Sequence, residues 1–161
     1  MKFWLILVTL FIVPFSLAES WDQYKIAEGQ CKIAFPKPPN HIKSFSLLNK
    51  SENIQTDIYL SHDEGDNIFV LLIANFPRKL SKEEKKSAIE GFIQGFIHNK
   101  KSAQVDLLPN DDRSSYFVRI IEKSHQILGR IVMKQNRLYF QATESREEQV
   151  VRSFFKSFLR E

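Results

Sequence analysis

Apolar and polar residues alternate with a period of two over much of the chain. Successive side chains of a strand point to opposite faces, so this pattern predicts β-strands. Two short runs, 21–26 and 31–35, are separated by a turn at Gly29, and Pro36 ends the second run because proline cannot donate to a ladder. Further strands are predicted at 41–48, 54–60, 102–108, 114–124 and 127–134.

Residues 68–76 form a nearly continuous apolar run, which predicts a central strand buried on both faces. Further along, Gln135 and Asn136 separate two alternating runs, and we expect a two-residue hairpin loop there because asparagine tolerates positive φ. This register places Lys134 opposite Arg137. It also gives the hairpin a core face that consists of Ile131, Met133, Leu138 and Phe140.

Residues 80–101 carry apolar side chains at helical spacing. Ser81 and Glu84 have the spacing of a capping box. The apolar stripe consists of Ala88, Ile89, Phe92, Ile93, Phe96 and Ile97. Gly91 and Gly95 each lower the helix propensity by about 1 kcal/mol relative to alanine. Two such residues one turn apart predict close approach of this helix to another element.

A second helix is predicted over 145–161, where Ser145 and Glu148 repeat the capping-box spacing. Its apolar stripe consists of Val150, Val151, Phe154, Phe155 and Phe158. Strands therefore dominate the chain, and each helix follows a run of strands. This order predicts an α+β fold, an antiparallel β-sheet flanked by helices.

Residues 1–18, MKFWLILVTLFIVPFSLA, have the layout of a secretory signal peptide. Lys2 precedes an apolar run of about 15 residues, shorter than the roughly 20 that span a bilayer. Ser16 and Ala18 then place small residues before a cut at Glu19. We expect an exported protein, periplasmic or secreted, with no stable membrane anchor after cleavage. An uncleaved membrane anchor is the alternative.

Cleavage leaves 161 − 18 = 143 residues, the size of one domain, which we place over 19–161. Lys2 is the only charge removed, so the formal net charge falls from +4 to +3, a mild excess that does not call for nucleic acid. Cys31, the only cysteine, shares a strand face with Ile33 and Phe35. We interpret its thiol as part of the core, with intermolecular pairing or reactivity as the alternative.

Two stretches carry a resemblance to a known family. EGQCKIAFPKPP is similar to the opening hairpin of a group of exported bacterial proteins, in which an SI-x-FP-x-P strand precedes a proline-rich break. RLYFQATESREEQVVRSFFKSF resembles their closing hairpin and helix, which ends in F-x-x-SF. This group shares the fold of PsbP, the extrinsic lumenal protein of photosystem II. The resemblance implies an α/β/α sandwich. It implies no catalytic residue, because the matching positions are structural in kind: Phe35, Pro36, Tyr139, Phe155, Ser157 and Phe158.

The motifs of common catalytic and metal sites are missing from the sequence. It has no glycine-rich phosphate loop, no G-x-S-x-G and no H-E-x-x-H. No metal-ligand spacing connects the histidines, which are His41, His62, His98 and His125. The stretch 61–67, SHDEGDN, has the composition of a calcium loop, but it lacks EF-hand spacing and we interpret it as a turn. We therefore expect no catalytic residue, cofactor or metal.

One surface feature is a candidate site. The hairpin face opposite the core residues carries Arg130, Lys134, Arg137 and Tyr139, with Arg119 on a neighbouring strand as a further candidate. A basic stripe with an aromatic contact suits an anionic partner. Lys134 facing Arg137 across a ladder is a mild conflict between like charges. The alternative is a solvated strand face neutralised by carboxylates such as Glu122 or Glu144.

Several functions agree with these observations. A non-enzymatic exported accessory or protein-interaction module, whose partner is another protein, fits the missing motifs and the PsbP resemblance. The alternatives are a small-ligand-binding protein or enzyme with a non-motif site, and a host-directed secreted effector. A pocket gathering titratable groups of shifted pKa would favour a ligand or enzyme site. An exposed apolar patch would favour protein interaction.

Overall fold

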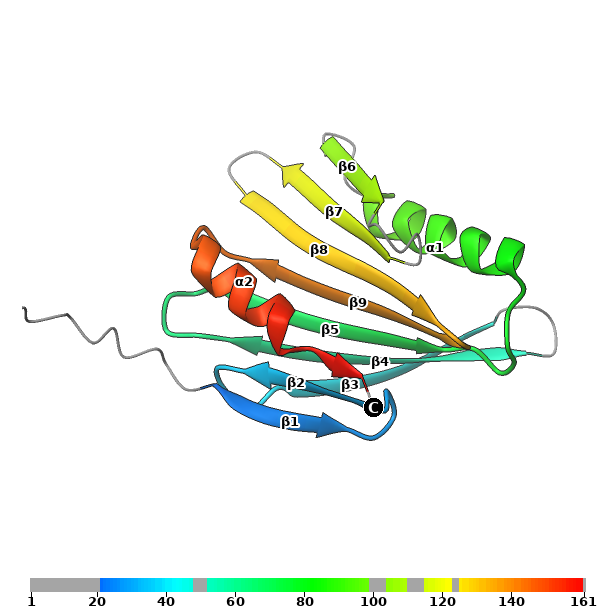
Figure 1. The fold of residues 1–161 in the computed structure, drawn as a ribbon, viewed down its shortest axis with the longest axis horizontal. Helices are drawn as coiled ribbons and strands as arrows, with labels where there is room; N and C mark the ends of the chain where they lie inside the picture. Colours follow the sequence, from blue (N-terminus) through cyan, green and yellow to red (C-terminus); the bar gives the residue numbers. More distant parts are fainter. Residues whose placement is uncertain (1–20, 48–51, 99–103, 110–114, 123–124, 161) are drawn as a thin grey trace, which may run out of the picture.

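The computed structural model describes residues 21–47, 52–98, 104–109, 115–122 and 125–160 (Figure 1). In these residues the chain forms ten strands and two helices. The strands are β1 (Asp22–Ile26), β2 (Cys31–Phe35), β3 (Asn40–Leu47), β4 (Asn53–His62), β5 (Ile68–Asn75), β6 (Gln104–Pro109), β7 (Ser115–Glu122), β8 (His125–Lys134), β9 (Arg137–Glu144) and β10 (Leu159–Arg160). The helices are α1 (Lys82–Ile97) and α2 (Glu148–Ser157). The predicted signal peptide lies outside the described residues.

The strands form two sheets. The long sheet has the order β3-β4-β5-β9-β8-β7-β6, and the small sheet has the order β1-β2-β10. Every strand pair in them is antiparallel, so the predicted α+β class is confirmed. Figure 1 shows α2 over β9 and β5, and α1 at the end of the sheet where β6, β7 and β8 lie. Among the described residues, neither helix is long and apolar enough to cross a bilayer.

One core lies between α1 and the long sheet, and we call this side of the sheet the α1 face. Phe140 of β9 is its centre, because the Phe92 and Phe96 rings of α1 lie 5.0 and 5.2 Å from the Phe140 ring. Ile89 and Ile93 of α1 are also buried here. The predicted core face of the β8–β9 hairpin is confirmed, since Ile131, Met133, Leu138 and Phe140 all belong to this core.

A second core fills the space between the opposite face of the long sheet, the small sheet and α2. The Phe154 ring of α2 lies 5.2 Å from Phe69 of β5 and 5.9 Å from Phe35 of β2. Cys31 and Ile33 belong to the same core, and both are 0% exposed. The interpretation of Cys31 as a packing residue is confirmed. Its burial also leaves the thiol out of reach of a second chain.

The apolar run 68–76 contributes to both cores, as predicted. Phe69, Leu71 and Ile73 are 0% exposed in the second core, while the alternate positions Leu72 and Ala74 pack on the α1 face. β5 pairs with β4 on one side and β9 on the other. An apolar side chain therefore has a partner at nearly every position, which explains why the run does not alternate.

The predicted two-residue loop and its register are confirmed, with Lys134 paired to Arg137. The positive φ, however, belongs to Gln135 (53°) and not to Asn136. Asn136 is fixed by the strand end next to it, because its Nδ2 donates to the Phe76 carbonyl oxygen at 2.8 Å. The Phe76 N–H in turn donates to the Asn136 carbonyl oxygen at 2.9 Å.

The capping prediction is right for one helix and wrong for the other. Ser81 Oγ accepts from the Glu84 N–H at 3.2 Å and Glu84 Oε2 accepts from the Ser81 N–H at 2.8 Å, which completes the capping box of α1. In α2 the N-cap is Glu147, and Ser145 Oγ accepts from the Glu147 N–H at 3.1 Å. Ser145 therefore closes the turn before the helix instead of capping it.

The predicted close approach at Gly91 and Gly95 is wrong. A Cβ added at either position would meet no atom within 4 Å. Both residues are exposed, because α1 turns Ile89, Ile93 and the aromatic residues toward the sheet. The two glycines leave space beside the helix, and at Gly91 this space is part of the groove described next.

Candidate functional site

A groove of about 800 Å³ lies between α1 and the long sheet. Its floor consists of Ser46, Ile54, Thr56, Leu72, Ala74 and Leu138. Its wall and ends consist of Phe76, Arg78, Leu80, Glu83, Glu84, Ser87, Ala88, Gly91 and Phe92. We call this cavity the α1 groove. Most of its lining is apolar, which is the usual composition of a binding pocket.

Strand register builds the floor. Thr56 of β4 pairs with Ala74 of β5, and Ala74 pairs with Leu138 of β9. Directly paired residues of antiparallel strands point to the same face, so these side chains form one surface below α1. The wall repeats at helical spacing along α1, from Glu84 through Ala88 to Phe92. Small side chains on both surfaces leave the volume between them.

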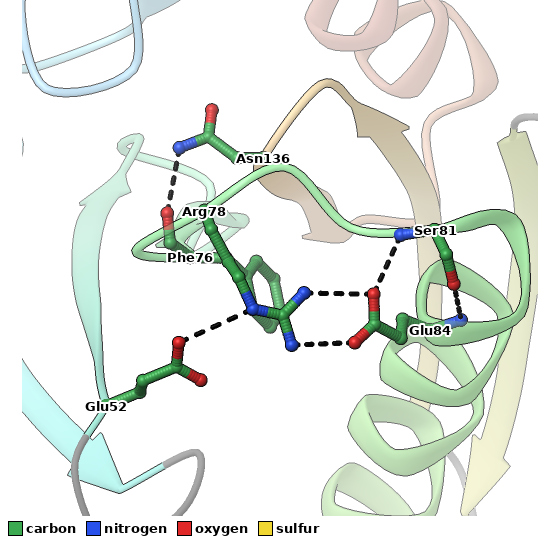
Figure 2. A network of polar contacts seen from close by, with 6 residues as sticks. All are labelled: Glu52, Phe76, Arg78, Ser81, Glu84 and Asn136. Atoms are coloured by element: carbon green, nitrogen blue, oxygen red, sulfur yellow. Dashed lines mark hydrogen bonds and ion pairs between the residues drawn. The ribbon is translucent and has the colours of Figure 1, made fainter.

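Arg78 lies at the centre of the polar rim of the groove, where it contacts Glu84 and Glu52 (Figure 2). Its two terminal nitrogens donate to the two Glu84 carboxylate oxygens at 3.0 and 2.7 Å, a bidentate pair. Its Nε lies 3.4 Å from Glu52 Oε1. Because Glu84 is also the capping-box residue of α1, this network joins the strand β4 side of the groove to the first turn of the helix.

The rim carboxylate titrates far below its usual range. The hydrogen bond from Arg78, followed by the Ser81 N–H, lowers the pKa of Glu84 from 4.5 to about 2. The same pair raises the pKa of the Arg78 guanidinium. Arg78 and Glu84 are therefore both charged at neutral pH, and Glu84 has no proton to transfer there. Such a pair orients and binds; it does not serve as a general acid.

The α1 face continues beyond the groove over β3, β4 and β5, where no described helix covers it. We define the open sheet face as Ile42, Ile58, Leu60 and Ile68. Ile42 is 53% exposed, Leu60 38% and Ile68 39%. Ile42 pairs with Ile58, which pairs with Leu72 at the groove floor, so the open sheet face and the groove are one surface. Exposed apolar patches of this kind mark binding surfaces.

The opposite face of β3 and β4 holds a polar cluster that sequence reasoning missed. Asp57 is 0% exposed, and its carboxylate lies 2.9 Å from His41 Nε2 and 2.7 Å from Gln55 Nε2. Tyr59 OH donates to Glu28 Oε2 at 3.1 Å, and burial followed by that carboxylate raises the pKa of the Tyr59 phenol. Asp57 within the apolar run 54–60 was the signal available in the sequence.

The candidate anionic-partner stripe does not form a continuous exposed surface. Tyr139 is 4% exposed and its hydroxyl donates to the Gly29 carbonyl oxygen at 2.7 Å, so the proposed aromatic contact is wrong. Arg130 donates to Gln141 Oε1 and to the Phe155 carbonyl oxygen, at 2.8 and 3.1 Å. The physical reason is that α2 and the small sheet cover this face, which the solvated-face alternative also missed.

The remaining stripe residues lie toward the end of the hairpin. Arg137 donates to Asn75 Oδ1 at 2.9 Å and to Gln30 Oε1 at 3.0 Å, which draws its charge away from Lys134. Lys134 is exposed. Anion binding at Arg130, Lys134 and Arg137 stays a prediction.

The stretch 61–67 is a turn, as interpreted. Asp63 Oδ1 accepts from the Gly65 N–H at 2.8 Å and the Asn67 N–H at 2.9 Å, and its Oδ2 accepts from Asn67 Nδ2 at 2.7 Å. The carboxylate is thus engaged in closing the loop. Across the described part of the chain, no group of three or more histidine, cysteine, aspartate or glutamate side chains is placed to hold a metal ion.

Fold and groove together define an α+β sandwich with an apolar groove on one face. No protein-family model matches the chain, and no curated protein matches it. It is similar to the solution structure of cyanobacterial PsbP (CyanoP) from Synechocystis sp. PCC 6803. The TM-score is 0.54, over 89% of this chain and 94% of that chain, at 10% sequence identity. At this identity the likeness shows the fold alone, and the expected PsbP-like fold is confirmed.

Proposed function

We propose that this protein is a non-enzymatic exported accessory protein that binds another protein through the α1 groove and the open sheet face. One observation carries the proposal: the apolar groove runs without interruption onto side chains that are one third to one half exposed. Leaving such a surface in water is costly, and covering it with a partner recovers that free energy.

The composition of the groove supports binding over catalysis. Its titratable lining residues are Arg78, Glu83 and Glu84, and two of these are held in a bidentate pair. The fold likeness to PsbP agrees with an accessory role without naming a partner. Export rests on the layout of residues 1–18, and mass spectrometry of the mature protein tests it. An N-terminus at Glu19 is expected, whereas an intact Lys2 contradicts cleavage.

A small apolar ligand is the second candidate, and the groove volume favours it. About 800 Å³ lies within the roughly 300–1,000 Å³ of small-molecule pockets. Such a ligand would be recovered with the purified protein, so native mass spectrometry distinguishes this candidate function from binding of a protein partner. No observation bears on the host-directed effector, which stays a prediction from the sequence.

The test uses the two glycines of α1 as a matched pair. Leucine at Gly91 projects into the groove, whereas leucine at Gly95 does not, and neither meets an atom within 4 Å at its Cβ. Both substitutions raise helix propensity equally. We expect Gly91→Leu to lose both Nile red binding and the proteins captured from the exported fraction, while Gly95→Leu keeps both. Equal capture by the two variants would overturn the proposal.

A further inference from the structure

The strip of the long sheet that the described residues leave uncovered has the width of one helix. It comprises the parts of β3, β4 and β5 that carry the open sheet face, and it continues the floor of the α1 groove on the same strands. Neighbouring strands lie about 4.8 Å apart, so two spacings give about 10 Å. An α-helix with its side chains is about 10–12 Å across. A single helix lying beside α1 would therefore cover the strip.

We propose that the occupant is a basic amphipathic helix of a partner protein, lying along β3, β4 and β5 with its apolar side on the open sheet face. This inference rests on the proposed function and deepens it by naming the chemistry of the partner. The apolar positions lie on the face of the strands, which suits the i, i+3, i+4, i+7 contacts of a helix. A strand added at the β3 edge would leave that face open.

The charge of the groove rim favours basic side chains on that helix. Arg78 contributes one positive charge, and Glu83 and Glu84 contribute two negative charges, so the charged residues that line the groove sum to −1. The whole chain carries a formal charge of +4. The groove is thus an acidic site on a basic protein, and within the described part of the chain no lysine lines it. Complementary charge of this kind selects partners and fixes their register.

A second copy of the chain does not supply this helix from its described residues. The apolar stripe of α1 packs in the first core, and the stripe of α2 packs in the second. Phe154 of α2 is 0% exposed and Ile93 of α1 is 6% exposed. Neither helix has an apolar side left to offer, so we assign the occupant to a different protein.

The experiment uses two 18-residue peptides with the same leucine positions at helical spacing, one with lysine and one with glutamate elsewhere. We expect the lysine peptide to bind about tenfold more tightly in calorimetry, because a few exposed charge pairs together amount to that factor. Attraction by the net positive charge of the whole protein would instead favour the glutamate peptide. Equal binding, or tighter binding of the glutamate peptide, would overturn the inference.

Two pairs of variants locate the bound helix. Ile42→Gln removes an exposed apolar side chain of the open sheet face, whereas Phe45→Gln removes one, 64% exposed, from the opposite face of the same strand. We expect about fivefold weaker binding of the lysine peptide for the first and no change for the second. Glu83→Lys should weaken it about tenfold. Glu90→Lys has the same charge change outside the groove and should have little effect.

The outcomes separate this inference from the proposed function. If neither peptide binds while Gly91→Leu still abolishes Nile red binding and partner capture, the basic helix is wrong and the groove remains the binding site. If peptide binding survives Gly91→Leu, Ile42→Gln and Glu83→Lys alike, the peptide binds elsewhere and the inference fails. If capture is also insensitive to Gly91→Leu, the proposed function fails with it.

Discussion

The imidazole of His41 lies flat on the ring of Tyr59, with ring centroids 4.4 Å apart and planes 4° apart. This stacking aims His41 Nε2 at the carboxylate of Asp57, which has no exposed surface. A buried carboxylate needs hydrogen-bond donors, because removing one leaves its desolvation uncompensated. The Tyr59 ring therefore holds the His41 imidazole in place, and the imidazole supplies a hydrogen bond that the buried Asp57 carboxylate needs.

His41→Ala is expected to lower the free energy of unfolding by about 1–3 kcal/mol, the range for a buried polar group that loses its partner. Lys43→Ala is the control, because Lys43 Nζ lies 3.8 Å from the same carboxylate on a side chain that is 43% exposed. That pair should contribute about 0–1 kcal/mol. Urea denaturation measures both, and equal effects of the two substitutions would contradict this account.

Stability should fall in acid as Glu84 takes up a proton. Its folded-state pKa of about 2 lies below the ordinary 4.5, so the unfolded chain binds the proton first. The contribution of Glu84 is complete above pH 4.5 and is lost as the pH falls toward 2. NMR titration should show a Glu84 midpoint near 2, shifted upward toward 4.5 in Arg78→Ala. An unchanged midpoint in that variant would show that Arg78 is not the cause.

Gly129 is expected to be intolerant of alanine. A Cβ there would lie 2.6 Å from Cε2 of Phe140, whose ring is held by Phe92 and Phe96. Such overpacking costs about 1–3 kcal/mol. Gly95→Ala, by contrast, has open space and should stabilise the protein by about 0.5–1 kcal/mol through helix propensity. Thermal unfolding of the two variants should therefore shift in opposite directions.

The Cys31 thiol should be unreactive in the folded protein. It is 0% exposed, so a thiol reagent such as Ellman's reagent reaches it only when the chain opens. We expect a rate at least about a hundredfold below that in urea. Fast reaction under native conditions would revive the interpretation of Cys31 as a chemical site. Cys31→Ser should cost about 1–3 kcal/mol, since it buries a hydroxyl in an apolar core.

Local signals were enough to predict most elements. The alternation in 31–35 and the pairing of Lys134 with Arg137 need only neighbouring residues, and so does the capping box at Ser81. The misassigned cap at Ser145 has the same spacing, but its hydroxyl was taken by a turn. Spacing alone does not distinguish a cap from a turn that precedes one.

The groove and the burial of Tyr139 could not be read from local pattern. The groove floor joins Thr56, Ala74 and Leu138, which meet only through the order of strands in the sheet. Tyr139 was assigned to an outer face because alternation suggests one wet side. Its side is covered by β2 and α2, from distant parts of the chain. Polar pattern shows which residues share a face, whereas topology decides what covers it.

The pairing of β10 with β2 has a consequence for biogenesis. Leu159 lies opposite Lys32 and Arg160 opposite Cys31, so the small sheet closes only with residues near the end of the sequence. The opening hairpin therefore gains its second neighbour in the small sheet only after residues 159 and 160 have been synthesised. Until then β2 is hydrogen-bonded to β1 alone in that sheet, so the edge that faces β10 stays open during synthesis of the residues between them.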